Sequence, residues 1–370
     1  MTAAGWRFAL VLGGGGTKGL AHVGVLRALA EREWTPDVVV GNSIGALVGA
    51  AWASDFTVAE LEAVALSMQR RDVFAIARSE MAARRLRAPG IYKGEPLEDL
   101  VRGILGDATF DELPRRLIVA SVDVNSGTAL YWGLPGLRDV SVADAVFASC
   151  ALPGFFPPRE IHDRFLVDGA LVDNLPVAVA AAQDVEGIVA VDVGSSGVLR
   201  AEVQESGFAS VVARGSEIVF HHMLELRLAH WTSPPMLLVQ PRVEHVPMFS
   251  FAHNRELIDE GHRATAAALD QAEAVRRATG GIFPRRLVEV AVDRERCIGC
   301  GACVALGPPG TFRMDASGKA VGPSAPQEWS PISGGVVCHC PTYAITAHPM
   351  REAAGGPTGG GSTGTARARA

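Results

Sequence analysis

Two glycine-rich segments, each placed between a short apolar run and a helical pattern, constrain the fold of this chain most strongly. The first, Gly13–Gly19, follows Phe8–Leu12, and the second, Gly41–Gly45, follows Val38–Val40. Runs that are apolar on both faces are typical of strands buried in a parallel sheet, where helices form the crossovers. The sequence therefore predicts an α/β fold with a mainly parallel central sheet covered by helices.

The same alternation continues to the glycines at 280 and 281, where the composition changes. We expect an α/β domain over residues 1–284, a small α+β domain over 285–349 and a disordered, Gly/Ser/Thr-rich tail over 350–370. Further strands are expected at Leu117–Val124, Phe165–Val167, Gly187–Val193 and Leu287–Val292, and helices at Leu20–Arg32, Thr57–Gln69, Val140–Ser149, Gly207–His230 and His253–Thr279.

Composition excludes some classes of protein. A net charge of −6 and a pI of about 5.9 argue against a nucleic-acid partner, because such proteins normally carry a basic surplus. No apolar run reaches the length of about 20 residues that a membrane-spanning helix needs. The mean hydropathy of +0.20 still leaves peripheral membrane contact open. Five of the six cysteines cluster in the last quarter, which predicts cluster or metal ligation in a reducing, cytoplasmic compartment.

The first glycine segment alone supports two interpretations. Gly14, Gly16 and Gly19 fit the dinucleotide pattern G-x-G-x-x-G, and Asp37 follows about 20 residues later. Alternatively, the backbone N–H groups of this turn form an oxyanion hole for acyl transfer. The motif by itself does not decide between the two.

The second segment favours acyl transfer. Residues 41–45 read G-x-S-x-G and place Ser43 on a strand-to-helix turn, the context of a nucleophilic serine. A dinucleotide site has no use for this turn. Asp168, which ends a short apolar strand, is the candidate base, because no histidine occupies the usual place after the last core strand. His22 is expected to pack in the first helix, and His162, His221 and His222 are expected in the core or on the surface.

Four short segments form a combination that is more specific than any one of them. In chain order they are the glycine turn with the helix after it, the serine turn, a proline-rich turn, and an aspartate turn. The segments are Gly14–Gly19 running into Ala21–Leu26, Gly41–Ala46, Ala148–Pro158, and Asp168–Ala170 with Asn174–Pro176.

This combination resembles the patatin-like phospholipase family. The resemblance implies a three-layer fold and a Ser43–Asp168 dyad that works without histidine. It also implies an oxyanion hole made by the amides of Gly14, Gly15 and Gly16. A lipid or lysophospholipid ester would be the substrate.

The resemblance covers about residues 6–280 and includes two mild departures, Lys18 where arginine is common and Ala170 where glycine is common. Both are frequent variants and leave the expected activity intact. An aspartate with an ordinary pKa of about 3.9 is a weak base at neutral pH. We therefore expect a hydrogen bond between Asp168 and the serine, and burial that raises the pKa of this carboxyl.

The cysteine-rich segment points to a metal cluster. Cys297, Cys300 and Cys303 have C-x2-C-x2-C spacing, and the glycines at 299 and 301 allow the backbone to approach the sulfides. A structural zinc usually requires paired C-x2-C knuckles, and residues 338–340, Cys-His-Cys, do not form such a pair.

Residues 286–348 resemble the single-cluster bacterial ferredoxins. The resemblance implies one [4Fe–4S] cluster held by Cys297, Cys300, Cys303 and Cys340, the last of which precedes a proline. Cys338 is either a ligand in place of Cys340 or a spare thiol, and the proline after Cys340 favours the second. Two hypotheses follow for the whole chain: a lipid acyl hydrolase with a redox, regulatory or structural cluster, or a redox protein that meets an electron-transfer partner and uses the hydrolase fold as a docking body.

Overall fold

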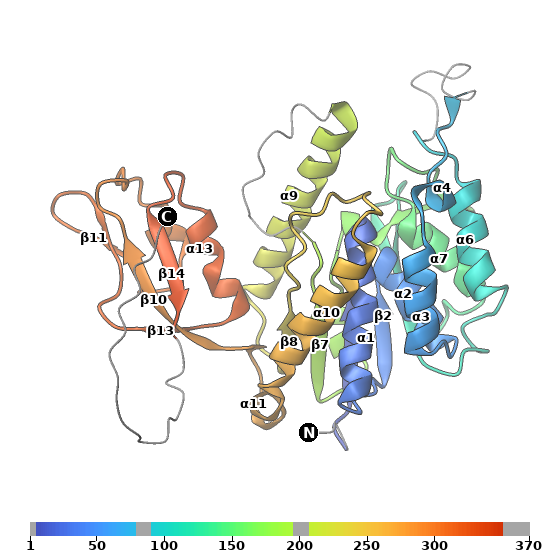
Figure 1. Cartoon of the computed structure of the whole chain (residues 1–370), viewed down its shortest axis with the longest axis horizontal. Helices are drawn as coiled ribbons and strands as arrows, with labels where there is room; N and C mark the ends of the chain where they lie inside the picture. Colours follow the sequence, from blue (N-terminus) through green and yellow to red (C-terminus); the bar gives the residue numbers. More distant parts are fainter. Residues whose placement is uncertain (1–4, 79–89, 195–206, 351–370) are drawn as a thin grey trace, which may run out of the picture. The chain divides into compact units, whose positions relative to one another are not determined.

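The computed structural model describes residues 5–78, 90–194 and 207–350, and Figure 1 shows how their elements follow one another. The chain divides into two compact units between Pro284 and Arg285, and Ser330–Gly335 is grouped with the first unit. The tail predicted to be disordered lies outside the described residues, apart from Met350.

A mainly parallel sheet forms the centre of the first unit, as the sequence predicts. Its described strands are β1 (Phe8–Leu12), β2 (Val38–Gly41), β3 (Leu117–Asp123), β4 (Thr128–Trp132), β5 (Arg159–Ile161), β6 (Arg164–Asp168), β7 (Gly187–Val191), β8 (Met236–Val239) and β9 (Ile282–Phe283). The strands β3-β2-β1-β7-β8-β9 are parallel, whereas β4 and β6 pair with β3 in the antiparallel sense and β5 pairs with β6. The carboxyl ends of the parallel strands meet at one edge of the sheet, where such folds bind ligands.

The alternation of side chains along the strands divides the core into two layers. In β1, Leu10 and Leu12 belong to one buried cluster, and Ala9 and Val11 belong to the other. All five residues of β1 are buried, which explains why the strand is a continuous apolar run.

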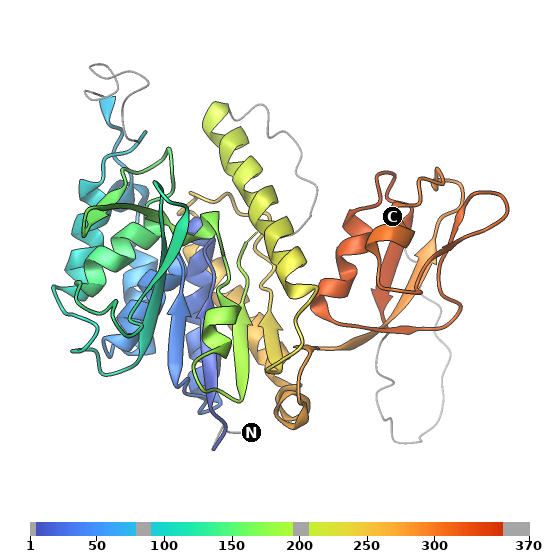
Figure 2. The ribbon, with the colours of Figure 1, turned by 180° about the vertical axis from the view of Figure 1, so that it is seen from behind.

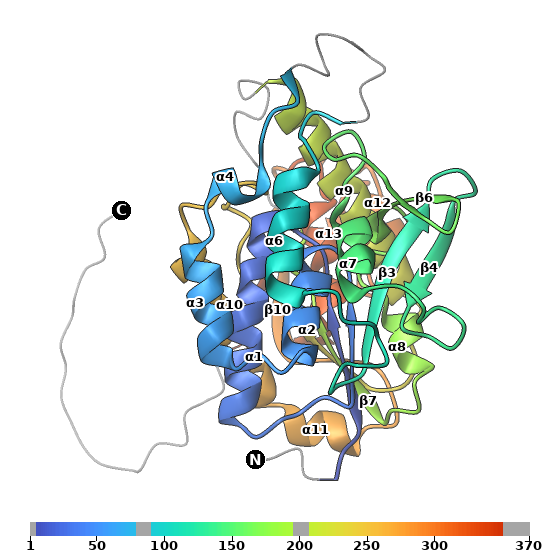
Figure 3. The same ribbon diagram turned by 90° about the vertical axis from the view of Figure 1, so that its right-hand side faces the viewer.

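Helices cover both faces of this sheet, as Figures 2 and 3 show. The helices of the first unit are α1 (Ala21–Glu31), α2 (Ile44–Ala53), α3 (Val58–Ser67), α4 (Arg70–Val73), α6 (Glu95–Leu105), α7 (Val142–Cys150), α8 (Val177–Ala181), α9 (Phe208–Leu228), α10 (Asn254–Leu269) and α11 (Ala272–Arg277), with short 3-10 turns η1 (Gly16–Leu20) and η3 (Gly169–Leu171). The helices α1, α2 and α10 pack on one face, and α8 packs on the other. The helix predicted at 253–279 is two helices, because the chain turns at Asp270 and Gln271.

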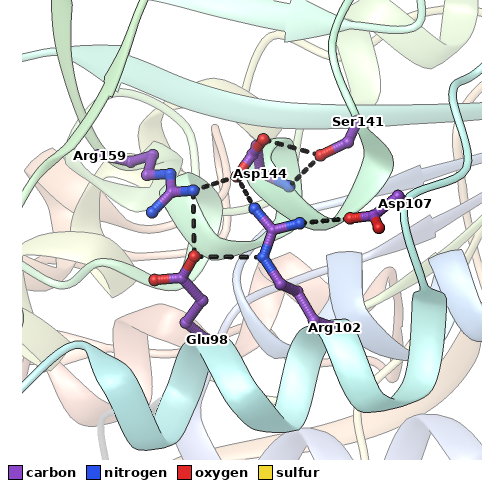
Figure 4. A network of polar contacts seen from close by, with 6 residues as sticks. All are labelled: Glu98, Arg102, Asp107, Ser141, Asp144 and Arg159. Atoms are coloured by element: carbon purple, nitrogen blue, oxygen red, sulfur yellow. Dashed lines mark hydrogen bonds and ion pairs between the residues drawn. The ribbon is translucent and has the colours of Figure 1, made fainter.

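A network of ion pairs fixes α7 against α6 (Figure 4). Arg102 of α6 pairs with Asp144 of α7 at 2.8 Å and with Glu98 at 3.2 Å. Arg159 of β5 pairs with the same two carboxylates. Partly exposed pairs contribute little individually, but a shared network holds its elements in register. The network therefore holds the first turn of α7, which carries Asp144, against α6.

The second unit is small and mostly antiparallel. Strand β10 (Arg286–Val292) lies between β13 (Gln327–Trp329) and β14 (Ile345–Pro349), and β11 (Arg313–Met314) and β12 (Ala320–Val321) form a separate antiparallel pair. The other short elements are α12 (Ala302–Leu306) and α13 (Gly335–Cys338), whereas η5 (Pro331–Gly334) belongs to the segment grouped with the first unit. The buried apolar cluster of this unit includes Cys297 and Cys303, so the cysteine-lined site is part of its core.

Candidate active site and cysteine cluster

Ser43 occupies a tight turn between β2 and α2. Its φ of 53° lies in the left-handed region, which an L-residue adopts only when its surroundings impose it. A Cβ atom at Gly41 would collide with the backbone of Ala46, and one at Gly45 would collide with the carbonyl of Leu12. The two glycines of the G-x-S-x-G pattern therefore allow the chain to turn sharply under the serine.

Asp168 lies at the end of β6, only 3% exposed, beside this turn. Its Oδ1 accepts hydrogen bonds from the Ala170 amide at 2.9 Å and from Asn42 Nδ2 at 3.2 Å. The Ser43 side chain lies next to this carboxylate. Burial raises the pKa of Asp168 to about 6, although the Ala170 amide, the Ser43 hydroxyl and Asn42 lower it. The structure thus brings together the two residues that the sequence nominated as nucleophile and base.

The glycine turn lies next to the serine, but its amides are not equivalent. The Gly14 amide donates to Asn174 Oδ1 at 3.1 Å, and Asn174 Nδ2 donates back to the Gly14 carbonyl at 3.1 Å. The amides of Gly15 and Gly16 make no such hydrogen bond within the part of the chain that the structure describes. Of the three predicted oxyanion donors, Gly14 is already engaged, and Gly15 and Gly16 line the cavity beside Ser43.

The dinucleotide interpretation of the glycine turn finds no support in the position of Asp37. The carboxylate of Asp37 accepts a hydrogen bond from the Phe8 amide at 2.8 Å, at the amino end of β1. The glycine turn follows the opposite end of this strand. Asp37 is therefore too far away to bind a ribose at the turn and has a structural role.

An open cavity adjoins Ser43 and Asp168. Aromatic side chains form much of its wall: Phe74 packs against Phe156 and Phe249 with ring centroids 5.5 and 5.1 Å apart. Aliphatic residues complete the lining, namely Leu20, Leu47, Met68, Val73, Leu97, Leu100, Leu152, Leu224 and Met248. A long apolar wall with a few polar groups at one end suits a ligand that is itself mostly hydrocarbon.

Two residues at the end of α7 contact the serine, and the sequence analysis gave neither a role in the site. Ser149, which is fully buried, accepts a hydrogen bond from the Ser43 amide at 2.8 Å. Cys150 lines the cavity next to the Ser43 side chain, and burial raises the pKa of its thiol. The signal that could have revealed them is their position directly before the proline-rich turn of the family motif.

The histidines lie where the sequence predicted. His22 is fully buried, and its Nε2 hydrogen-bonds to the Gly13 carbonyl at 2.8 Å beneath the glycine turn. Burial lowers the pKa of His22 to about 4, so its ring is neutral at physiological pH. His221 lines the cavity, and a hydrogen bond to Glu225 raises its pKa. His162 and His222 are exposed.

A buried ion pair joins the glycine turn to α9. Lys18 Nζ lies 2.9 Å from Glu217 Oε1, and the two side chains are 1% and 4% exposed. A second pair joins α9 to the segment after Asp168, since Arg227 Nη1 lies 2.8 Å from Asp173 Oδ2. Helix α9 is thus tied to both chain segments that build the site.

In the second unit, the cysteines at 297, 300, 303 and 340 line one cavity. Cys338 is exposed and does not line it. Gly299 and Gly301 have φ values of 74°, and a Cβ atom at Gly299 would collide with the carbonyl of Gly318. This backbone folds the cysteine loop around the cavity. The donor set and the enclosed space fit an iron–sulfur cluster.

Backbone amides point at two of these sulfurs. The Ala320 amide donates to Cys297 Sγ at 3.5 Å, and the Ala344 amide donates to Cys340 Sγ at 3.3 Å. Burial raises the pKa of Cys340, but amide hydrogen bonds, with that of Thr342 the strongest, outweigh it and lower this pKa overall. Such hydrogen bonds stabilise thiolates and tune the reduction potential of a bound cluster.

Comparison with protein families assigns both regions. Residues 10–181 match the patatin-like phospholipase family, and residues 290–328 match a 4Fe-4S single cluster domain. The first match spans the glycine turn, Ser43 and Asp168. The second contains three of the four cysteines that line the cavity and ends before Cys340.

Several curated proteins are similar to the first region. An uncharacterized NTE family protein of Mycobacterium bovis is 33% identical over 190 residues, which are 51% of this chain and 50% of that protein. Lysophospholipase NTE1 of Mycosarcoma maydis is 33% identical over 202 residues, 52% of this chain and 10% of that protein. Among solved structures, VipD from Legionella pneumophila is similar over 72% of this chain and 67% of that chain, with 14% identity and a TM-score of 0.40. The chain spans about half the length of the mycobacterial relatives it matches.

Proposed function

Because residues 10–181 belong to the patatin-like phospholipase family, we propose that this chain is a serine hydrolase of lipid or lysophospholipid esters, with Ser43 as nucleophile and Asp168 as base. The observation that carries the proposal is that the Ser43 hydroxyl lies beside a buried carboxylate whose pKa burial raises to about 6. A base of this pKa is largely ionised at neutral pH and accepts a proton more readily than an ordinary aspartate does.

The first half of the reaction acylates the serine. Ser43 Oγ attacks the ester carbonyl carbon while its proton passes to Asp168. The amides of Gly15 and Gly16 stabilise the oxyanion of the tetrahedral intermediate, while Asn174 holds Gly14 in place beside them. As the intermediate collapses, the carbon–oxygen bond of the ester breaks and Asp168 returns the proton to the leaving alcohol.

The second half releases the acid. A water molecule gives a proton to Asp168 and attacks the acyl-serine, and the same amides hold the second oxyanion. Collapse of this intermediate returns the proton to Ser43 Oγ and frees the fatty acid. The substrate class is supported by the aromatic and aliphatic wall of the cavity, which would hold an acyl chain, and by the similarity to a lysophospholipase.

The same proposal assigns one [4Fe–4S] cluster to Cys297, Cys300, Cys303 and Cys340. All four thiols line one cavity, whereas Cys338 does not. When bound, such a cluster exchanges single electrons, in a redox or regulatory role, or is structural. The chain's own residues contribute four thiolates and the amides of residues 320 and 344 that donate to the sulfurs. Free thiols of this kind suit the cytoplasm, a reducing compartment.

The direct test replaces the nucleophile. Ser43→Ala is expected to abolish hydrolysis of p-nitrophenyl butyrate and of lysophosphatidylcholine, because no other hydroxyl contacts Asp168 among the described residues. The matched control is Ser54→Ala, which removes a buried hydroxyl at the far end of α2 and should retain turnover. Undiminished turnover in Ser43→Ala would refute the assignment.

A further inference from the structure

A second cavity, which we call the rear cavity, adjoins the cavity beside Ser43. All the described residues that line it are apolar, and most belong to the buried core of the first unit. Four side chains line both cavities and form the partition between them: Leu20, Ile44, Leu47 and Met68. Close-packed cores contain few voids, because unfilled apolar space costs stability. An apolar cavity beside a nucleophile is therefore a candidate extension of the substrate site.

One face of α2 leads from the nucleophile into the rear cavity. Its members have the spacing i, i+3, i+4 and i+7 of one side of a helix: Ile44, Leu47, Val48 and Ala51. Ile44 and Leu47 line both cavities, whereas Val48 and Ala51 line only the rear cavity. Since a helix rises about 1.5 Å per residue, Ala51 lies about 12 Å beyond Ser43 along α2. The rear cavity is thus reached by a ligand that extends along α2, away from the reacting serine.

Helix α3, which packs against α1 and α2 (Figure 3), forms the facing wall. Its contribution repeats the same spacing and ends directly after the helix: Leu61, Val64, Ala65 and Met68. Ala51 of α2 and Ala65 of α3 are both buried, and their small side chains leave room for hydrocarbon between the two helices. Met68 is unbranched and has three rotatable bonds, so its side chain can move aside for a ligand that passes from one cavity to the other.

We propose that the rear cavity binds the distal end of a long acyl chain whose ester carbonyl lies at Ser43. This inference rests on the proposed hydrolase function, because the acyl chain is that of its substrate. Carbon–carbon bonds of about 1.5 Å advance an extended chain by about 1.25 Å each, so roughly ten carbons cover the distance from Ser43 to Ala51. Acyl chains of about eight carbons therefore stay in the cavity beside the serine, whereas chains of about 12 or more reach the rear cavity. The rear cavity makes the enzyme selective for long-chain acyl esters.

The test compares substrates of different chain length. Hydrolysis of p-nitrophenyl butyrate, octanoate, laurate and palmitate is measured at one detergent concentration, and each kcat/KM is divided by that for butyrate. In the parent chain, this ratio should be higher for palmitate than for octanoate. Ala65→Leu extends the wall into the rear cavity and should lower the palmitate ratio by about tenfold or more, because each methylene group left unburied costs about fourfold. The octanoate ratio should keep its parent value.

Two further variants make the test specific. Ala63→Leu is the matched control, since it places the same side chain at an exposed position of α3 and should keep every ratio. Ala51→Leu narrows the rear cavity from α2 and should repeat the loss for palmitate, so the test does not depend on the folding of one variant.

Four results would overturn the proposal. They are a parent ratio that is no higher for palmitate than for octanoate, palmitate ratios that are unchanged in both wall variants, an equal fall in the control variant, and a fall that is already complete with octanoate. The last result would assign the effect to the cavity beside the serine.

Binding separates this inference from the proposed function. In the full chain carrying Ser43→Ala, calorimetry should show that palmitate binds at least about tenfold more tightly than octanoate, and that Ala65→Leu removes most of this difference. If Ser43→Ala retained esterase activity while palmitate binding still depended on Ala65, the hydrolase proposal would fail and the rear cavity would stand. If Ser43→Ala lost activity but Ala65→Leu left palmitate binding unchanged, the rear cavity alone would be refuted.

Discussion

The two sites of this chain tune acid–base groups in opposite directions. At the serine site, burial raises the pKa of Asp168 to about 6 and makes the carboxylate a better base. At the cysteine site, backbone amides lower the pKa of Cys340 and favour the thiolate, the form of the side chain that would bind iron. The serine site depends on burial beside a large core, and the cysteine site depends on backbone donors in a small unit with little core. Burial, which raises a pKa, thus suits a carboxylate base, whereas amide hydrogen bonds, which lower a pKa, suit a thiolate ligand.

The strongest test of the serine site removes the buried charge of Asp168. Asp168→Asn keeps the size of the side chain and the oxygen that accepts from Ala170 and Asn42, but it removes the base. We expect kcat/KM for p-nitrophenyl butyrate to fall on the order of 10³-fold. Iron content and visible absorbance should not change, because the cysteines are untouched. A loss of less than about tenfold would show that Asp168 is not the base.

Stability provides an independent check on the same variant. The folded-state pKa of Asp168, about 6, lies above its ordinary value of 3.8, so the folded state favours the protonated carboxyl. Stability therefore falls as pH rises from 3.8 to 6 and stays lower above it. Asp168→Asn removes this cost and should raise the free energy of unfolding at pH 7.5 by up to about 3 kcal/mol. An inactive but stabilised variant would separate loss of chemistry from loss of fold.

The two sites also differ in how much the sequence reveals. The cysteine loop is local, because C-x2-C-x2-C lies within seven residues. The glycines between the cysteines indicate where the backbone adopts a positive φ. The Ser43–Asp168 pair is distant in sequence, and only the order of four motifs predicted it. Strands β1, β2 and β7 were predicted closely because they are buried on both faces.

Other features depend on contacts that no pattern encodes. Strand β4 was missed because its residues are partly exposed and its pairing with β3 is antiparallel. The link from Asn174 to Gly14, which engages one predicted oxyanion donor, depends on side-chain rotamers across the cavity. The pair of Lys18 with Glu217 joins residues that only the docking of α9 brings together. Sequence motifs nominated the groups that we propose to react, whereas tertiary packing decides which amides remain available.

Two nearby thiols, Cys338 and Cys340, provide a test of the cysteine site. Cys340→Ala removes a thiol that lines the cavity, and Cys338→Ala removes one that does not. We expect iron per chain and absorbance near 400 nm to fall by about tenfold or more in Cys340→Ala, because a cube needs its fourth thiolate. Cys338→Ala should retain the parent iron content after anaerobic purification. The reverse pattern would make Cys338 the ligand.

The smallest expected effect is a pH dependence confined to the serine site. Asp168 must be ionised to accept a proton, so protonation through its pKa of about 6 should lower kcat/KM as the pH falls. At pH 5 the rate should be about one tenth of the plateau above pH 7. The buried carboxyl of Asp173 also has a pKa raised by burial to about 6, so it titrates over the same range and supplies the control. Asp173→Asn should keep the acid limb, whereas the residual activity of Asp168→Asn should show none. If the acid limb disappeared in Asp173→Asn, the titrating group would be Asp173, which pairs with Arg227. The pH dependence would then give no support to Asp168 as a base of raised pKa.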